Sequence, residues 1–151
     1  MERLAPFGRQ TGLESAVKML YNWLGMEQPR ISGKRILVVE DDSSARDSIT
    51  LLLRIDRHIV TEAKNGEEAL DLVSGQPFDL VVMDYAMPGM LGDELAGTIK
   101  KLSPGQAVLM ITGSAEKHGI PQNCIDGFLN KPFTLAELRQ AVAPLVSQVP
   151  A

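Results

Sequence analysis

Asp84 is the residue of this chain whose type and position most clearly suggest chemistry. It ends a short apolar run, residues 80–83, and a loop that contains Pro88 and Gly89 follows it. A continuous apolar run with β-branched residues is typical of a strand that is buried on both faces of a parallel sheet. Since open α/β sheets bind ligands at the carboxyl ends of their strands, Asp84 is a candidate for chemistry.

Three other apolar runs, at 36–39, 107–112 and 124–130, also lead into polar side chains. Because the carboxyl ends of parallel strands meet at one edge of a sheet, we expect these polar groups to lie close together. Taken singly, each has an ordinary explanation, such as a helix cap, a strand-end hydroxyl or a solvated loop lysine. Their joint arrival at one edge favours a functional site. The candidate residues are Glu40, Asp41, Asp42, Asp84, Thr112, Ser114 and Lys131.

Three carboxylates held together at this edge would repel one another. At a separation of about 4 Å each pair costs about 1 kcal/mol at the dielectric constant of water and about 4 kcal/mol at an effective value of about 20. Three pairs then cost roughly 3 to 12 kcal/mol, which is comparable to the stability of a whole domain. A cation relieves this repulsion, and all-oxygen ligands point to Mg²⁺ or Mn²⁺. Zinc is disfavoured because the chain has only two histidines, His58 and His118.

A hard cation beside a carboxylate, a hydroxyl and an ammonium group is the equipment for phosphoryl transfer. An oxygen of Asp84 would attack the phosphorus. The cation and Lys131 would neutralise the phosphoryl oxygens, and Thr112 would donate a hydrogen bond to one of them. No general base is required, because the carboxylate is already ionised. Phosphorylated Asp84 would carry about two negative charges, toward which Thr112 and Lys131 would be drawn.

The elements that must position these residues alternate along the chain. We expect strands at 36–39, 58–63, 79–84, 107–112 and 124–130, and helices at 44–56, 67–74, 92–102 and 135–146. A weaker helical segment at 115–123 is interrupted by a glycine and a proline. Asp42 or Ser43 should cap the first of these helices, and Thr134 the last. The alternation predicts an α/β fold with a parallel sheet, helices on both faces and right-handed crossovers.

The overall composition limits the class of protein. With 151 residues the chain is long enough for one domain and an extension, and 44% hydrophobic and 23% charged residues are ordinary for a globular protein. A net charge of −4 argues against a nucleic-acid-binding surface, which requires clustered cations. Cys124 is the only cysteine, so no disulfide framework forms. With neither a signal peptide nor a long apolar run, we expect a cytoplasmic protein.

Residues 1–33 differ from the rest and are predicted to form an extension. Thr11 and Glu14 have the spacing of a capping box, and apolar residues at helical spacing follow as far as Leu24. This pattern predicts an amphipathic helix over residues 12–24. The helix packs on its own domain, is the end of a longer element, or serves in docking or dimerisation. A membrane-surface helix is disfavoured, because the polar face is not basic. The chain is therefore expected to be a monomer, or a dimer through this helix.

Residues 34–149 resemble the receiver domain of bacterial two-component response regulators, and in particular the chemotaxis-regulator type. Four motifs in the family's order carry the resemblance: ILVVEDD, LVVMDYAMPG, VLMITGS and GFLNKPF. The intervals from Asp41 to Asp84, from there to Thr112, and from there to Lys131 are 43, 28 and 19 residues, which also resemble the family's spacing. The resemblance implies a flavodoxin-like, doubly wound sheet of five parallel strands in the order 2-1-3-4-5.

The resemblance also implies how the site would bind a metal and a phosphoryl group. Asp84 would be the phosphoacceptor and a metal ligand. Glu40 and Asp41 would be the acidic pair that holds Mg²⁺, or Mn²⁺, with the backbone carbonyl of Ala86 as a further ligand. Lys131 would be the phosphate-binding lysine, joined to the following proline by a cis peptide bond.

Two further residues would form the switch of such a domain. Thr112 would be the switch hydroxyl, and Phe128 the aromatic side chain that rotates inward when the hydroxyl moves. One departure from the family lies in the segment after this hydroxyl, where Gly119 and Pro121 interrupt the expected fourth helix. Because that helix belongs to the surface that changes on phosphorylation in the family, the output surface of this chain is expected to differ.

The family cycle implies phosphoryl transfer from a sensor histidine kinase or a histidine phosphotransfer protein to a switch protein, not a turnover enzyme. No output domain is expected after the last helix, so the chain resembles a stand-alone receiver or the receiver of a hybrid kinase in a phosphorelay. One rival is a phosphatase of the haloacid dehalogenase type, which carries Asp-x-Asp on its first strand and would turn over a generic phosphomonoester. The other rival is an interaction module that is not phosphorylated. The presence of the acceptor aspartate, the acidic pair and the lysine argues against it.

Overall fold

The structure, a computed structural model, describes residues 16, 19–25, 31–113 and 124–147. The chain divides into two compact units, Met1–Arg30 and Ile31–Ala151, which are described separately. In the first unit residue 16 and residues 19–24 are helical, as predicted for these parts of the segment 12–24. Its large apolar side chains Met19 and Trp23 are exposed. The rest of that prediction, and the predicted weak helix at 115–123, lie outside the described residues.

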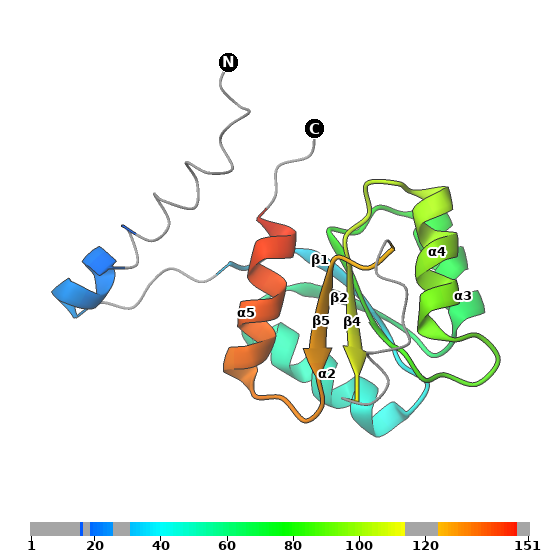
Figure 1. Ribbon diagram of the computed structural model, residues 1–151, viewed down its shortest axis with the longest axis horizontal. Coiled ribbons are helices and arrows are strands. Elements are labelled where there is room, and N and C mark those ends of the chain that lie inside the picture. The colour runs from blue at the N-terminus through cyan, green and yellow to red at the C-terminus, as the bar shows by residue number, and fades with distance from the viewer. Residues whose placement is uncertain (1–15, 17–18, 26–30, 114–123, 148–151) are drawn as a thin grey trace, which may run out of the picture. The chain divides into compact units, whose positions relative to one another are not determined.

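The second unit contains a sheet of five parallel strands in the order β2-β1-β3-β4-β5 (Figure 1). The strands are β1 (Arg35–Val39), β2 (Ile59–Ala63), β3 (Leu80–Asp84), β4 (Val108–Thr112) and β5 (Gly127–Asn130). Every residue of β3 and β4 is buried, as is every residue of β1 after Arg35. Burial on both faces explains why these strands are continuous apolar runs in the sequence. The predicted fold class and strand order are confirmed.

Helices cover both faces of the sheet, as the alternation of elements predicted. They are α2 (Ser43–Ile55), α3 (Gly66–Gly75), α4 (Gly92–Leu102) and α5 (Leu135–Val146). Helices α3 and α4 lie on one face, while α2 and α5 lie on the other (Figure 1). Because successive strand side chains point to opposite faces, Leu37 and Val39 join the buried cluster beneath α3 and α4, and Ile36 and Val38 join the other. None of the described helices is both long and apolar enough to cross a membrane.

Side-chain caps start two of the helices where the sequence predicted them. The carboxylate of Asp42 accepts a hydrogen bond from the backbone N–H of Ala45 at 3.0 Å and so caps α2. The hydroxyl of Thr134 accepts one from the N–H of Glu137 at 3.1 Å, and the Glu137 side chain completes a capping box at α5. Each cap satisfies an N–H group that would otherwise lack a partner in the first turn. The loops that follow β1 and β5 therefore end at defined points.

Strand β5 is shorter than predicted, because it begins at Gly127 and not at Cys124. The reason is the side chain of Asp126, whose Oδ2 accepts hydrogen bonds from the N–H of Val108 at 2.8 Å and from Lys100 Nζ at 2.7 Å. A side chain thus takes the place that a main-chain carbonyl would take if β5 extended further. Local apolar character did not reveal this, because the carboxylate's partners lie 18 and 26 positions away in the sequence.

Candidate functional site

The carboxyl edge of the sheet gathers polar residues from four strands. Glu40 follows β1, Asp84 ends β3, Thr112 ends β4 and Lys131 follows β5. The register of the sheet brings these positions to one level, since Val39 pairs with Met83 and Asp84 pairs with Ile111. Main-chain hydrogen bonds extend this order past the strand ends, because the N–H of Lys131 donates to the carbonyl of Thr112 at 2.9 Å. The candidate Ser114 lies outside the described residues.

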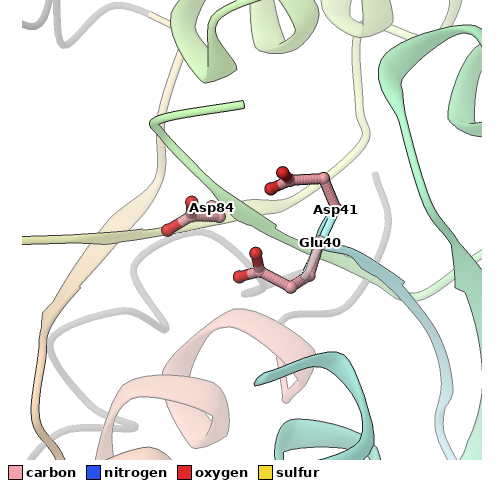
Figure 2. A group of neighbouring side chains, drawn as sticks. All are labelled: Glu40, Asp41 and Asp84. Atoms are coloured by element: carbon pink, nitrogen blue, oxygen red, sulfur yellow. The ribbon is translucent and has the colours of Figure 1, made fainter. Parts of the chain in front are cut away.

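Three carboxylates form the centre of the site. One oxygen from each of Glu40, Asp41 and Asp84 lies within 4.8 Å of the others. Figure 2 shows the three side chains gathered where β1 and β3 end. Glu40 and Asp84 are almost fully buried, with 2% and 6% exposure, whereas Asp41 is exposed. The site is therefore a small acidic pocket with one open side.

Lys131 reaches this pocket from the end of β5. Lys131 Nζ lies 2.8 Å from Asp84 Oδ1 and 4.0 Å from Glu40 Oε1, and 42% of the lysine side chain is exposed. The peptide bond between Lys131 and Pro132 is cis, as the resemblance implied. The ammonium group thus stands directly beside an oxygen of Asp84, where it would also lie beside any group attached to that oxygen.

The negative charge of the pocket is under-compensated. Burial, and after it the charge of Asp84, raises the pKa of Glu40 from its usual 4.5 to about 7, against the opposing effects of the Asp42 N–H and Lys131. Glu40 Oε2 accepts a hydrogen bond from that N–H at 3.2 Å, but Oε1 is buried without a hydrogen-bond partner. An all-oxygen donor set with an unsatisfied buried oxygen fits a hard divalent cation such as Mg²⁺.

The two candidate switch residues lie on the neighbouring strands. Thr112 has no exposed surface, and its hydroxyl donates a long hydrogen bond of 3.5 Å to Asn130 Oδ1. Phe128 is partly buried and packs against the cluster of buried residues beneath α3 and α4. Ala86 is exposed in the loop after β3. Within the described part of the chain, the hydrogen bond of the Thr112 hydroxyl is thus a weak one, which a stronger acceptor could replace.

Gly92 also shapes the site, although the sequence suggested for it only the start of a helix. A Cβ atom at this position would lie 2.8 Å from the carbonyl oxygen of Asp84 and 2.8 Å from the Cα of Tyr85. The N–H of Gly92 donates to the Tyr85 carbonyl at 2.8 Å, which closes the loop back on the end of β3. Any side chain here would push against the backbone that carries Asp84. The sequence reasoning also missed Arg46, whose guanidinium donates to the backbone carbonyl of Glu40 at 2.8 Å, since an arginine within a helix carries no signal of its own.

This fold and pocket together define a class of protein: an α/β domain that presents a buried, lysine-paired aspartate beside two further acidic residues at the carboxyl edge of a parallel sheet. A family model for the response regulator receiver domain matches residues 36–143. The chain therefore belongs to the response regulator receiver family, whose members serve two-component systems as phosphorylated switches. This confirms the family that the motifs indicated.

Curated relatives agree with this assignment. The chain is 35% identical over 108 residues to the response regulator MprA of Mycolicibacterium vanbaalenii, an alignment covering 69% of this chain and 46% of MprA. It is 33% identical over 108 residues to a cyclic di-GMP phosphodiesterase of Thermotoga maritima, covering 69% of this chain and 28% of the relative. The chain thus spans less than half the length of both proteins, and the similarity concerns the receiver portion.

Solved structures are similar to this chain over most of its length. The response regulator TrrA of Thermotoga maritima, in complex with Mg²⁺ and beryllium fluoride, aligns with a TM-score of 0.71 and 34% identity, covering 74% of this chain and 98% of TrrA. The receiver domain of a sensor histidine kinase of Pseudomonas aeruginosa, with a magnesium ion in its active-site cleft, aligns with a TM-score of 0.70 and 25% identity, covering 78% and 100%. Similar receivers therefore occur in response regulators and in kinases.

Proposed function

We propose that Asp84 is the phosphoacceptor of this receiver and that Lys131 and Thr112 are its catalytic partners. The observation that carries this proposal is the 2.8 Å contact between Lys131 Nζ and Asp84 Oδ1 inside an acidic pocket. An aspartate that is buried, paired with an ammonium group and placed at the open edge of a parallel sheet is equipped to act as a nucleophile. Within this proposal the receiver domain comprises residues 34–149, and residues 1–33 form an extension.

The proposed step is an in-line transfer from a phosphohistidine to the carboxylate. A carboxylate oxygen of Asp84 forms a bond to phosphorus while the bond from phosphorus to the imidazole nitrogen breaks, and the bonding electron pair stays on that nitrogen. The ammonium group of Lys131 neutralises charge on the phosphoryl oxygens. Water later hydrolyses the resulting acyl phosphate and restores the carboxylate. The chain is thus a switch that is modified and reset, and not a turnover enzyme.

The same pocket would hold Mg²⁺, with Mn²⁺ as a substitute. Side chains of Glu40, Asp41 and Asp84 would supply carboxylate oxygens, and Ala86 its backbone carbonyl. When bound, the cation would offset the negative charge of the acids and of the incoming phosphoryl group. This assignment rests on the spacing of the three carboxylates and on the unsatisfied Oε1 of Glu40. Metals that prefer sulfur or imidazole ligands, such as zinc, are disfavoured, because this cluster consists of carboxylates alone.

Thr112 and Phe128 would transmit the modification to the protein surface. A phosphoryl group on Asp84 offers charged oxygens, which are stronger acceptors than the Asn130 amide oxygen that Thr112 contacts at 3.5 Å. Movement of the hydroxyl toward the phosphoryl group would vacate space into which Phe128 rotates. The partner that phosphorylates the chain would be a sensor histidine kinase or a histidine phosphotransfer protein, acting in the cytoplasm. Nucleic acid is not an expected partner of this domain, since the net charge is −4.

Mass spectrometry of the intact chain after incubation with acetyl phosphate tests the proposed phosphoacceptor. We expect one added phosphoryl group in the presence of Mg²⁺ and none with a chelator. The variant Asp84→Asn should remain unmodified, and Lys131→Ala should react much more slowly. Asp79→Asn is the matched control, because Asp79 lies just before the opposite end of the same strand and its Oδ2 accepts from the N–H of Arg35. Modification of Asp84→Asn at the wild-type rate would refute the assignment.

A second test concerns the extension, for which we propose dimerisation through the predicted helix at 12–24. The exposed apolar side chains of Met19 and Trp23 support this proposal, because burial against a second copy would remove them from water. Light scattering should give a dimer for the full chain and a monomer after deletion of residues 1–30. An unchanged mass would refute dimerisation by this segment without affecting the assignment of Asp84.

A further inference from the structure

Arg46 contacts the loop that carries the acidic residues at two points. Its guanidinium Nη1 donates to the backbone carbonyl of Glu40 at 2.8 Å, and its own backbone N–H donates to the carbonyl of Asp42 at 2.9 Å. The two carbonyls lie on either side of Asp41, the exposed member of the acidic pair. The Arg46 side chain thus binds the loop before a proposed metal ligand, and the first main-chain hydrogen bond of α2, which any residue at position 46 would make, holds the loop after it.

Together with one further hydrogen bond, these contacts hold three successive peptide groups of the loop in place, from Glu40 to Ser43. The peptide plane after Glu40 is held by the guanidinium of Arg46, and the plane before Asp42 by the bond from its N–H to Glu40 Oε2 at 3.2 Å. The plane after Asp42 is held by the backbone N–H of Arg46. Because each peptide group is planar, fixing its carbonyl or N–H also fixes the two flanking Cα atoms. The starting point of the Asp41 side chain is therefore determined, although the side chain itself is exposed.

Arg46 is itself held in place by a residue of β2. Its Nε donates to Glu62 Oε1 at 3.1 Å, and only 17% of the arginine side chain is exposed. The planar guanidinium uses two of its donors in fixed directions, one toward the carboxylate of Glu62 and one toward the Glu40 carbonyl. A lysine at this position would keep the charge but could not reproduce this two-pronged arrangement.

We propose that Arg46 is a positioning residue for the acidic pair and that Glu62 anchors it. This inference rests on the proposed function, since it assumes that Glu40 and Asp41 hold a divalent cation. Its physical basis is preorganisation: ligands that are already fixed in place bind a metal more tightly than ligands that must be ordered on binding. The charge of Arg46 acts in the opposite direction, because a cation near the pocket repels Mg²⁺. If positioning dominates, replacing Arg46 weakens Mg²⁺ binding; if the charge dominates, removing it strengthens Mg²⁺ binding.

Titration of the metal-free full chain with MgCl₂, followed by backbone amide chemical shifts, tests the inference. We expect Arg46→Lys and Arg46→Met to weaken Mg²⁺ binding by about 10-fold to 100-fold, the range typical of residues that orient metal ligands. Glu62→Leu should cause a smaller loss. The matched control is Arg139→Lys, because Arg139 lies on a different helix, α5, and its guanidinium donates two hydrogen bonds of 2.8 Å to Asp56. Unchanged or tighter Mg²⁺ binding in both Arg46 variants would overturn the inference.

Amide hydrogen exchange without metal gives a second, independent readout. The N–H of Asp42 should exchange faster in Arg46→Lys than in the wild type, while the amides of β3 and β4 should remain protected. Equal exchange at Asp42 would also overturn the inference. Failure of the proposed function would give a different result from failure of this inference. A wild-type chain that binds Mg²⁺ but takes no phosphoryl group would contradict the role of Asp84, while the effect of Arg46 on Mg²⁺ binding would still be measurable.

Discussion

The buried carboxyl group of Glu40 should make the metal-free protein less stable than a variant that lacks its charge. A pKa raised from 4.5 to about 7 means that ionising Glu40 costs about 3 kcal/mol more in the folded chain than in the unfolded chain. Because the folded-state pKa is the higher one, the contribution of protonated Glu40 to stability is fully present below pH 4.5 and is lost as the pH rises through 7. Glu40→Gln removes the charge and keeps an oxygen that accepts from the N–H of Asp42. We therefore expect Glu40→Gln to be more stable than the wild type by about 2 to 3 kcal/mol at pH 8 in a chelator.

Urea denaturation followed by circular dichroism, at pH 5 and at pH 8, measures this difference. The gap between Glu40→Gln and the wild type should shrink strongly at pH 5, where Glu40 is largely protonated in the folded chain. Added Mg²⁺ should stabilise the wild type more than the variant, because a ligand that binds the folded state stabilises it more when its affinity is higher. Glu67→Gln serves as the control, since Glu67 is an exposed carboxylate in the first turn of α3. The reasoning is refuted if Glu40→Gln is the less stable protein at pH 8, or if the gap is the same at both pH values.

Three further predictions concern residues outside the pocket. The hydroxyl of Thr50 is buried without a hydrogen-bond partner, so Thr50→Val should raise the free energy of unfolding by about 1 kcal/mol. Thr98→Val removes a hydroxyl that donates to the Glu94 carbonyl and should not raise it. Urea denaturation of both variants tests this difference. Arg139 donates two hydrogen bonds of 2.8 Å to the nearly buried carboxylate of Asp56. Arg139→Met should therefore lower the free energy of unfolding by about 2 kcal/mol and lower the thermal melting midpoint. An unchanged midpoint would contradict this prediction. Burial lowers the pKa of His58 below 6.5, so the contribution of neutral His58 to stability is present above pH 6.5 and is lost as the pH falls through the folded-state pKa. His58→Asn should therefore lose less stability between pH 7 and pH 5 than the wild type. Equal losses in the two proteins would contradict this prediction.

Much of the fold could be predicted because its signals are local. The apolar runs of β1, β3 and β4 and the spacing of apolar residues in α2, α4 and α5 are visible in short windows of sequence. Asp42 and Thr134 were correctly predicted as helix caps, because a cap depends only on residues within one helical turn. The start of β5 was predicted incorrectly, because it depends on where Asp126 finds its partners in distant parts of the chain.

The sequence by itself determined which polar side chains reach the carboxyl edge of the sheet, since each follows an apolar run whose length and direction are set locally. Only the tertiary structure decided how those side chains meet. The contact of Lys131 with Asp84, the burial of Glu40 and the two contacts of Arg46 with the acidic loop all join residues from separate elements. Their physical effects, desolvation of a charge and hydrogen bonds of fixed direction, depend on distances that arise only when the strands and helices have packed together.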